Sequence, residues 1–188
     1  MDGRLIIVSA PSGAGKTTIV KQLMQSGLGL EFSVSATSRE PRPTETDGKD
    51  YYFISADEFR KKISNDELLE WQEVYEDQFY GTLRSEVNRI WKKGHHVLFD
   101  VDVKGGMNLK SMFPGNSLSI FIMPPSLEEL EKRLRLRSTE NRESLKKRIE
   151  KAEIELGFAD RFDRKVVNDN LEEAVRQIIS IVSQYLES

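Results

Sequence analysis

A lysine and a threonine follow two glycines near the start of the chain, in the stretch SAPSGAGKTT (residues 9–18). The stretch carries Gly13, Gly15, Lys16 and Thr17 and matches the phosphate-binding pattern G-x-x-x-x-G-K-[ST], except that Ala10 replaces the first glycine of the pattern. Glycines in such a loop let backbone N–H groups turn toward phosphate oxygens, while the following helix adds its positive end. We therefore expect a nucleoside triphosphate site at Ala10, Pro11, Ser12, Gly13, Ala14, Gly15, Lys16, Thr17 and Thr18. The alternative is a glycine-rich turn with an exposed lysine.

A second pattern suited to phosphate lies in residues 36–53, ATSREPRPTETDGKDYYF. Arg39 and Arg42 flank Pro41 and are followed by a glycine turn and Tyr51. Arginines in a non-helical loop can converge on one phosphate through paired hydrogen bonds, and a tyrosine hydroxyl can add another. The segment therefore predicts a second phosphate site, and a solvated polar loop is the alternative.

The string T-S-R-x-x-R-x-x-x-x-x-G-x-x-Y-x-F, together with the phosphate loop, resembles the signature of guanylate kinases. The resemblance covers nearly the whole chain and recurs in ELLEW (67–71), YGT (80–82), FDVDVKGG (99–106), RLRLRSTE (133–140) and VVNDN (166–170). It implies an enzyme that transfers the γ-phosphoryl group of ATP to GMP, and to dGMP, in purine nucleotide metabolism. It also implies Mg²⁺ bound with the ATP.

Site residues follow from this resemblance position by position. The implied GMP-binding residues are Ser35, Arg39, Arg42, Tyr51, Glu70, Tyr80, Thr82, Asp100 and Asp102. The physical chemistry agrees at Glu70, because a carboxylate can accept from both N1–H and N2–H₂ of guanine, whereas adenine presents an N1 lone pair. Thr82 would donate to O6 of guanine. The alternative for Glu70 is a solvent-facing acid on a strand.

The resemblance also implies a catalytic set and a border for the adenine. The catalytic residues are Lys16, Arg39, Asp100, Arg137 and Arg148, with Arg133 as a further candidate, and Asn168 and Asp169 border the adenine of ATP. Thr17 would bind Mg²⁺ through its hydroxyl and Asp100 through a water molecule. Asp100 ends an apolar run, so it should emerge at the carboxyl edge of the sheet, where ligands bind in open α/β folds. Capping of the next helix is the alternative for Asp100 and Asp102.

Basic side chains outnumber acidic ones in residues 132–151. Arg137 and Arg148 in this segment would reach the transferring phosphoryl group. For the remaining charges a solvated helix face is the preferred interpretation; these are Arg135, Arg142, Lys146 and Lys147.

Apolar runs of strand length alternate with amphipathic stretches of helix length, which is typical of a parallel sheet covered by helices. The expected strands are residues 5–9, 96–100, 118–123 and 165–168, and the expected helices are about 16–26, 83–93, 103–112, 126–136, 141–157 and 171–186. Residues 32–82 mix three short strands (FSVS, DYYFI and LLEWQEV) with a helix near 56–63. Phe59, Trp91, Phe121 and Met123 should be core residues, and Trp71 should pack under this insert.

We predict an α/β fold of the P-loop NTPase type, with an inserted nucleotide-monophosphate-binding subdomain and a helical lid. Residues 1–188 would form a single guanylate-kinase-like domain. Its core would be residues 1–31, 83–131 and 158–188, its GMP-binding subdomain 32–82 and its lid about 132–157.

Composition limits the class of partner. The chain has 188 residues, with 28 Lys and Arg against 31 Asp and Glu, and this net charge of -3 argues against a general nucleic-acid or membrane-surface binder. It has no cysteine, and no apolar run approaches the length of a membrane span. We therefore expect a cytoplasmic protein with ATP and GMP as partners, no nucleic acid and no membrane, and with no preference between monomer and homo-oligomer.

Two other functions fit parts of the pattern. Guanylate-kinase-like domains that have lost catalysis recognise peptides, but they typically lack an intact phosphate loop or lid arginines, which this chain retains. A related P-loop kinase could act on another nucleoside monophosphate or on a ribose phosphate. Glu70 with Thr82 discriminates against that alternative, because a non-purine acceptor would not need the pair.

Overall fold

The computed structural model describes the backbone of residues 3–137 and 142–188, and the side chains of residues 3–136 and 145–188. The chain forms two compact units. Unit 1 comprises Met1–Gly3 and Glu31–Val97, and unit 2 comprises Arg4–Leu30 and Leu98–Ser188. The described residues include no helix that is both long enough and apolar enough to cross a membrane.

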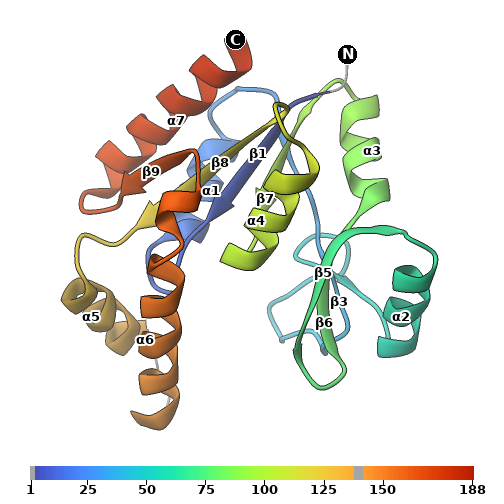
Figure 1. Ribbon diagram of the computed structural model, residues 1–188, viewed down its shortest axis with the longest axis horizontal. Coiled ribbons are helices and arrows are strands. Elements are labelled where there is room, and N and C mark those ends of the chain that lie inside the picture. The colour runs from blue at the N-terminus through green and yellow to red at the C-terminus, as the bar shows by residue number, and fades with distance from the viewer. Residues whose placement is uncertain (1–2, 138–141) are drawn as a thin grey trace. The chain divides into compact units, whose positions relative to one another are not determined.

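The larger sheet has five strands in the order β2-β7-β1-β8-β9. These strands are β1 (Leu5–Ser9), β2 (Leu30–Phe32), β7 (His96–Asp100), β8 (Ser117–Met123) and β9 (Arg164–Val167). In unit 2, β8 runs parallel to both β1 and β9 (Figure 1). All five residues of β1 are buried, which explains its unbroken apolar sequence, because strands of a parallel sheet are covered on both faces.

Five helices and a short 3₁₀ turn (Ala159–Arg161) complete the described part of unit 2. The helices are α1 (Lys16–Met24), α4 (Val103–Met112), α5 (Leu127–Arg137), α6 (Arg142–Leu156) and α7 (Leu171–Glu187). α1 packs against α7, and α4 packs against β1 and β8. Gly106 permits the contact of α4 with β1, because a Cβ atom at this position would lie 2.5 Å from Oγ of Ser9.

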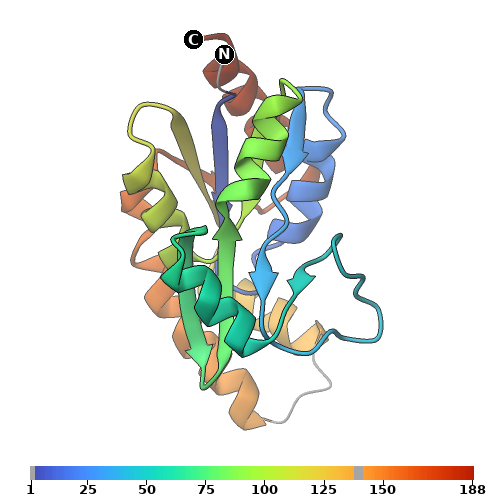
Figure 2. The same ribbon diagram turned by 90° about the vertical axis from the view of Figure 1, so that its right-hand side faces the viewer.

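Unit 1 contains a four-stranded sheet in the order β4-β3-β6-β5. Its elements are β3 (Ala36–Thr37), β4 (Tyr52–Phe53), α2 (Ala56–Ser64), β5 (Leu68–Tyr75), β6 (Gln78–Leu83) and α3 (Arg84–Lys92). Figure 2 shows α2, in teal, across the β5–β6 hairpin, and α2 packs against β6. The rings of Phe59 from α2 and Phe79 from β6 stack with centroids 5.2 Å apart in the core of this unit.

The mostly parallel sheet flanked by helices confirms the predicted α/β class. The strands predicted at residues 5–9 and 96–100 have the observed bounds, whereas β8 begins at Ser117 and β9 covers Arg164–Val167. Phe59 and Phe121 are fully buried as expected, and Trp91 and Met123 are partly buried.

The structure of unit 1 differs from the local expectations at three points. The segment FSVS is not one strand: Phe32 ends β2, and the next strand begins at Ala36. Residues 78–83 form β6, which the sequence did not indicate as a strand. The ring of Trp71 packs edge to face against Phe79, with centroids 6.2 Å apart, but Trp71 is 44% exposed, so the expected burial is only partial.

Candidate functional site

The glycine loop joins the end of β1 to the start of α1. Gly13 and Gly15 have φ angles of 91° and 93°, a region that favours glycine. A Cβ atom on Gly15 would also lie 2.3 Å from Nδ2 of Asn168, so a side chain would not fit there. Gly15 is the N-cap of α1 and supplies no side-chain oxygen to the first N–H groups of the helix. Such a helix N-terminus is suited to binding an anion.

Lys16 and Asp100 lie together beside this loop. Nζ of Lys16 lies 2.6 Å from Oδ1 of Asp100 and donates a 2.8 Å hydrogen bond to the carbonyl oxygen of Val101. Asp100, the last residue of β7, and the carbonyl oxygen of Val101 thereby hold the ammonium of Lys16, the first residue of α1, in one place. Thr17, the next residue of α1, is exposed.

Asp102 caps a helix. It is the N-cap residue of α4, and its Oδ1 accepts a 2.8 Å hydrogen bond from the backbone N–H of Gly105. The capping alternative therefore describes Asp102, whereas Asp100 pairs with Lys16.

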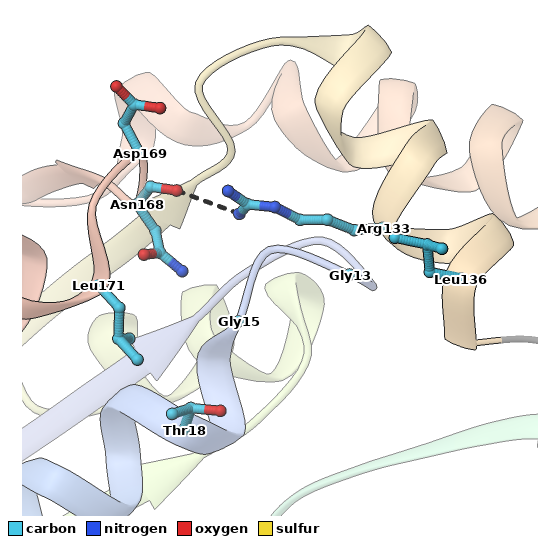
Figure 3. Close-up of a pocket in the computed structure, with 8 residues that line it drawn as sticks. All are labelled: Gly13, Gly15, Thr18, Arg133, Leu136, Asn168, Asp169 and Leu171. Carbon is cyan, nitrogen blue, oxygen red and sulfur yellow. Dashed lines mark hydrogen bonds between the residues drawn. The ribbon is translucent and has the colours of Figure 1, made fainter.

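A pocket of about 300 Å³ borders the glycine loop (Figure 3). Asn168, which directly follows β9, donates from Nδ2 to the carbonyl oxygen of Ala14 at 2.8 Å. Nη1 of Arg133 donates to the carbonyl oxygen of Asn168 at 3.1 Å, the contact drawn as a dashed line in Figure 3. The lining consists of glycine backbone, polar groups and two leucines: Gly13, Gly15, Thr18, Arg133, Leu136, Asn168, Asp169 and Leu171. Sequence reasoning missed the leucines, because isolated apolar residues on helices carry no signal of a pocket.

The structure describes the side chain of only one of the two proposed lid arginines, Arg148. Nη2 of Arg148, on α6, donates a 2.8 Å hydrogen bond to Oγ of Ser12, so this arginine reaches the glycine loop. Arg137 is the last residue of α5, and its side chain lies outside the described residues, as do residues 138–140 of the segment RLRLRSTE.

Arg39 is the centre of a polar cluster in unit 1. Its Nε atom donates to the hydroxyl of Tyr80 at 3.0 Å, and its guanidinium carbon lies 5.0 Å from the centroid of the Tyr51 ring. The tyrosine rings meet edge to face with centroids 5.9 Å apart. The structure therefore brings together three of the four residues predicted for the acceptor phosphate. The fourth, Arg42, has an exposed side chain.

Glu45 belongs to the same cluster and was missed by sequence reasoning. Its two carboxylate oxygens accept hydrogen bonds from Nη1 and Nη2 of Arg39, both at 2.7 Å, and Oε2 also accepts from the backbone N–H of Arg42 at 2.8 Å. These bonds, chiefly those from Arg39, lower the pKa of Glu45 from 4.5 to about 2. The only signal in the sequence was an acid three residues after Arg42.

Glu70 and Thr82 face each other across the β5–β6 hairpin. Oγ1 of Thr82 donates a 2.7 Å hydrogen bond to Oε1 of Glu70, and Thr82 is fully buried. Glu70 is partly buried and accepts this hydrogen bond, so it is not a fully solvent-facing acid. Ser35 is also partly buried, and its carbonyl oxygen accepts a 2.9 Å hydrogen bond from the N–H of Tyr52.

The parallel sheet, its covering helices and the glycine loop after the first strand define an α/β protein with a glycine turn at the start of α1. The family model described as guanylate kinase matches residues 2–185. The chain belongs to the guanylate kinase family.

Curated relatives and a solved structure agree with this assignment. A guanylate kinase of Bacteroides thetaiotaomicron is 50% identical over 186 residues, covering 99% of this chain and 91% of the relative. A guanylate kinase of Salinibacter ruber is 50% identical over 187 residues, covering 100% and 99% of the two chains. The crystal structure of guanylate kinase from Anaplasma phagocytophilum has a TM-score of 0.80 and 31% identity, covering 99% of this chain and 87% of that one.

Proposed function

We propose that this chain transfers the γ-phosphoryl group of ATP to GMP, giving ADP and GDP. Membership of the guanylate kinase family supports the reaction. The observation that carries the identity of the acceptor is the hydrogen bond from Thr82 to Glu70, because it fixes a carboxylate and a hydroxyl side by side within one hairpin. Guanine is the base whose N1–H and N2–H₂ groups match the Glu70 carboxylate, and its O6 would take the proton that the Thr82 hydroxyl otherwise donates to Glu70.

The donor nucleotide would bind in unit 2. Backbone N–H groups of the glycine loop and of the first turn of α1 would surround the β-phosphate, and Lys16 would reach the β- and γ-phosphates. Its ammonium has three N–H donors, of which Asp100 and the carbonyl oxygen of Val101 take two, so the third would bind a phosphate oxygen. The adenine would lie in the pocket lined by Asn168 and Asp169.

The acceptor phosphate would bind at Arg39, Arg42, Tyr51 and Tyr80. Glu45 and the carbonyl oxygen of Glu40 together accept three of the five N–H groups of the Arg39 guanidinium, and Tyr80 accepts a fourth. One N–H of Nη2 and the hydroxyl of Tyr80 are then available to the phosphate. Glu45 would hold the guanidinium in a fixed orientation for that contact.

Phosphoryl transfer requires positioning and charge neutralisation more than covalent participation by the protein. An oxygen of the GMP phosphate forms a bond to the γ-phosphorus as the bond from that phosphorus to the bridging oxygen of ADP breaks. Lys16, Arg148 and Arg137 would offset the negative charge that moves onto the bridging oxygen and the transferred group. This mechanism needs no general base.

Magnesium fits the oxygen donors beside the loop. The Thr17 hydroxyl and the Asp100 carboxylate are hard ligands of the kind that Mg²⁺ prefers. Among the described side chains no group of three or more His, Cys, Asp or Glu could hold a metal. Mg²⁺ commonly takes only one or two protein ligands and completes its shell with phosphate and water, and when bound it neutralises charge on the donor phosphates.

We also propose that residues 32–82 bind GMP within a single domain whose lid is residues 132–157. The compact unit that contains Glu31–Val97 supports the first assignment. The hydrogen bond from Arg148 to Ser12 supports the second, because it joins a helix of the proposed lid to the glycine loop. The proposal further places the protein in the cytoplasm, acting on free nucleotides.

The test is release of ADP in a coupled assay with ATP, Mg²⁺ and each of the four nucleoside monophosphates. GMP should stimulate turnover far more than AMP, CMP or UMP. Equal rates with AMP would reject the role given to Glu70. If no monophosphate is phosphorylated and calorimetry detects no affinity for ATP, the peptide-recognition alternative replaces the kinase.

A further inference from the structure

Glu86, in the first turn of α3, is a buried acid that the proposed mechanism does not use. Its residue is only 3% exposed. Oε1 accepts hydrogen bonds from the hydroxyl of Tyr52 at 2.9 Å and from Nε of Arg89 at 2.8 Å. Oε2 accepts from the backbone N–H of Val34 at 3.2 Å and from Nη2 of Arg89 at 2.9 Å. The carboxylate is thus bonded to three separate parts of unit 1.

A second layer of charges supports this carboxylate. Arg89 donates to Glu31 as well as to Glu86, and Glu31 also lies 2.9 Å from Nζ of Lys93 and 2.9 Å from Nδ1 of His95. Burial alone would raise the pKa of Glu86, but the hydrogen bonds from Arg89, Val34 and Tyr52 outweigh it and hold the pKa below its ordinary value. Glu86 therefore carries a negative charge at neutral pH.

The donors to Glu86 adjoin residues of the proposed acceptor site. Val34 directly precedes Ser35, and Tyr52 directly follows Tyr51. The two segments are also bonded to each other, because the N–H of Tyr52 donates to the carbonyl oxygen of Ser35 at 2.9 Å.

The third part of unit 1 that Glu86 joins is its own helix, α3. Leu83 is the N-cap of this helix and directly follows Thr82, the donor to Glu70. Glu86 lies at the third position of the helix, four residues after Thr82 in the chain.

A buried carboxylate is a costly way to fill space, since an apolar side chain of similar size is often as stable or more so. Residues 33–35 lie outside any strand, so the N–H of Val34 has no partner from a β-ladder. A carboxylate can accept this N–H, a hydroxyl and a guanidinium at once. The charge at position 86 therefore serves geometry more than stability.

We propose that Glu86 is a positioning residue for GMP: it ties the segment before β3 and the strand β4 to the start of α3, and so holds Ser35, Tyr51 and Thr82 in the arrangement that binds the nucleotide. This inference rests on the proposed function, because it assigns Glu86 to the acceptor site. Glu86 does not itself contact GMP in this account.

The decisive variant is Glu86→Gln, which keeps the size of the side chain but places an NH₂ group against donors. The matched control is Glu58→Gln. Glu58 occupies the same third position of α2, where it completes a capping box with Ser55, a role that glutamine also fills. Both variants would be compared with the wild type by initial-rate kinetics, GMP calorimetry, thermal melting and amide hydrogen exchange.

We expect Glu86→Gln to raise the KM and Kd for GMP about tenfold, while the KM for ATP stays within twofold and the Glu58→Gln values match the wild type. Exchange at the amides of residues 34–36 and 52–54 should increase without a matching increase in α7. If Glu86→Gln lowers only the melting temperature and leaves the KM and Kd for GMP within twofold, Glu86 is merely structural and the proposal is overturned.

A milder variant covers the case in which Glu86→Gln does not fold. Tyr52→Phe removes one donor and leaves the bonds from Arg89 and Val34, so the Kd for GMP should rise by about threefold with ATP affinity unchanged. An unchanged Kd for GMP in Tyr52→Phe, with unchanged exchange at residues 52–54, would overturn the proposal. Failure of the wild type to phosphorylate GMP would contradict the proposed function instead, and hydrogen exchange would still decide whether Glu86 fixes these segments.

Discussion

Nζ of Lys16 lies 2.6 Å from Oδ1 of Asp100, so the charged group of the glycine loop is held by the end of a neighbouring strand. The ammonium also donates to the carbonyl oxygen of Val101 at 2.8 Å, which restricts it to one orientation. Such pre-organisation reduces the cost of ordering a long side chain when a ligand binds. Asp100 therefore has two uses in the proposed mechanism, as a partner of Lys16 and as a ligand of magnesium-bound water.

Lys16→Met should reduce turnover with ATP and GMP by about 10²- to 10³-fold, because it removes the positive charge that the proposed mechanism places against the transferred group. Coupled ADP release provides the measurement. Lys21→Met is the matched control, since Lys21 lies on the same helix and is exposed. Equal loss of activity in both variants would mean that the charge of the helix matters and the position of Lys16 does not.

Glu70→Gln should lower kcat/KM for GMP by about 10²-fold and narrow the preference for GMP over AMP. The amide would present an NH₂ donor to a donor of guanine, and the same NH₂ could pair with N1 of adenine. Rates with both nucleotides measure the preference. Glu76→Gln, an exposed substitution in the β5–β6 turn, should leave both rates unchanged. An unaltered GMP to AMP ratio in Glu70→Gln would remove this residue from base recognition.

Gly15→Ala should destabilise the protein by more than about 1–2 kcal/mol, the cost of the left-handed backbone alone, and should weaken ATP binding. The added Cβ would lie 2.3 Å from Nδ2 of Asn168 and displace the amide that braces the loop. Gly27→Ala isolates the backbone cost, because Gly27 has a φ of 77° and its added Cβ would meet nothing within 4 Å among the described residues. Urea unfolding and ATP calorimetry on both variants separate the two effects. Equal destabilisation and equal ATP affinity would show that the Asn168 contact has no influence.

In Glu45→Gln, the free energy of unfolding should change less than in the wild type as the pH falls through the acid range. The pKa of Glu45 is about 2 in the folded chain and 4.5 ordinarily, so the unfolded chain takes up the proton first as the pH falls. The stabilisation is complete above about pH 4.5 and is lost as the pH falls through about 2. The wild type should therefore be more stable than Glu45→Gln at pH 7, with the difference shrinking toward pH 3 in urea unfolding.

The exposed neighbour Glu40 gives the control for that experiment. Glu40→Gln should follow the wild-type curve throughout. A constant difference between Glu45→Gln and the wild type from pH 7 to pH 3 would contradict the low pKa of Glu45.

Much of unit 2 could be predicted from the sequence because its signals are local. The apolar run of β1 is bounded by a glycine loop, and Asp100 marks the end of β7, so both strands have the expected bounds. Lys16 and Asp100 are 84 positions apart, but parallel strands place their carboxyl ends at one edge of a sheet, which made their proximity predictable.

Unit 1 was harder to predict because its short strands depend on tertiary contacts. The strand β6 contains Gly81, which resembles a turn residue, yet glycine is needed there because a Cβ would lie 2.7 Å from the carbonyl oxygen of Glu70. The backbone leaves strand geometry at Val34, whose N–H pairs with Glu86, 52 positions away. Nothing in the local pattern announces that partner, and the pairing of Arg39 with Glu45 had only a weak local signal, an acid three residues after Arg42.

The contact between Asn168 and Ala14 has a consequence for the order of events during protein synthesis. The loop emerges from the ribosome early, but the amide that donates to its carbonyl oxygen is 154 positions further along the chain. A nascent chain that stops short of β9 would present the glycine turn without its brace. The proposed ATP site would therefore be completed late in synthesis, and ATP should protect full-length chains from protease far better than ribosome-bound fragments.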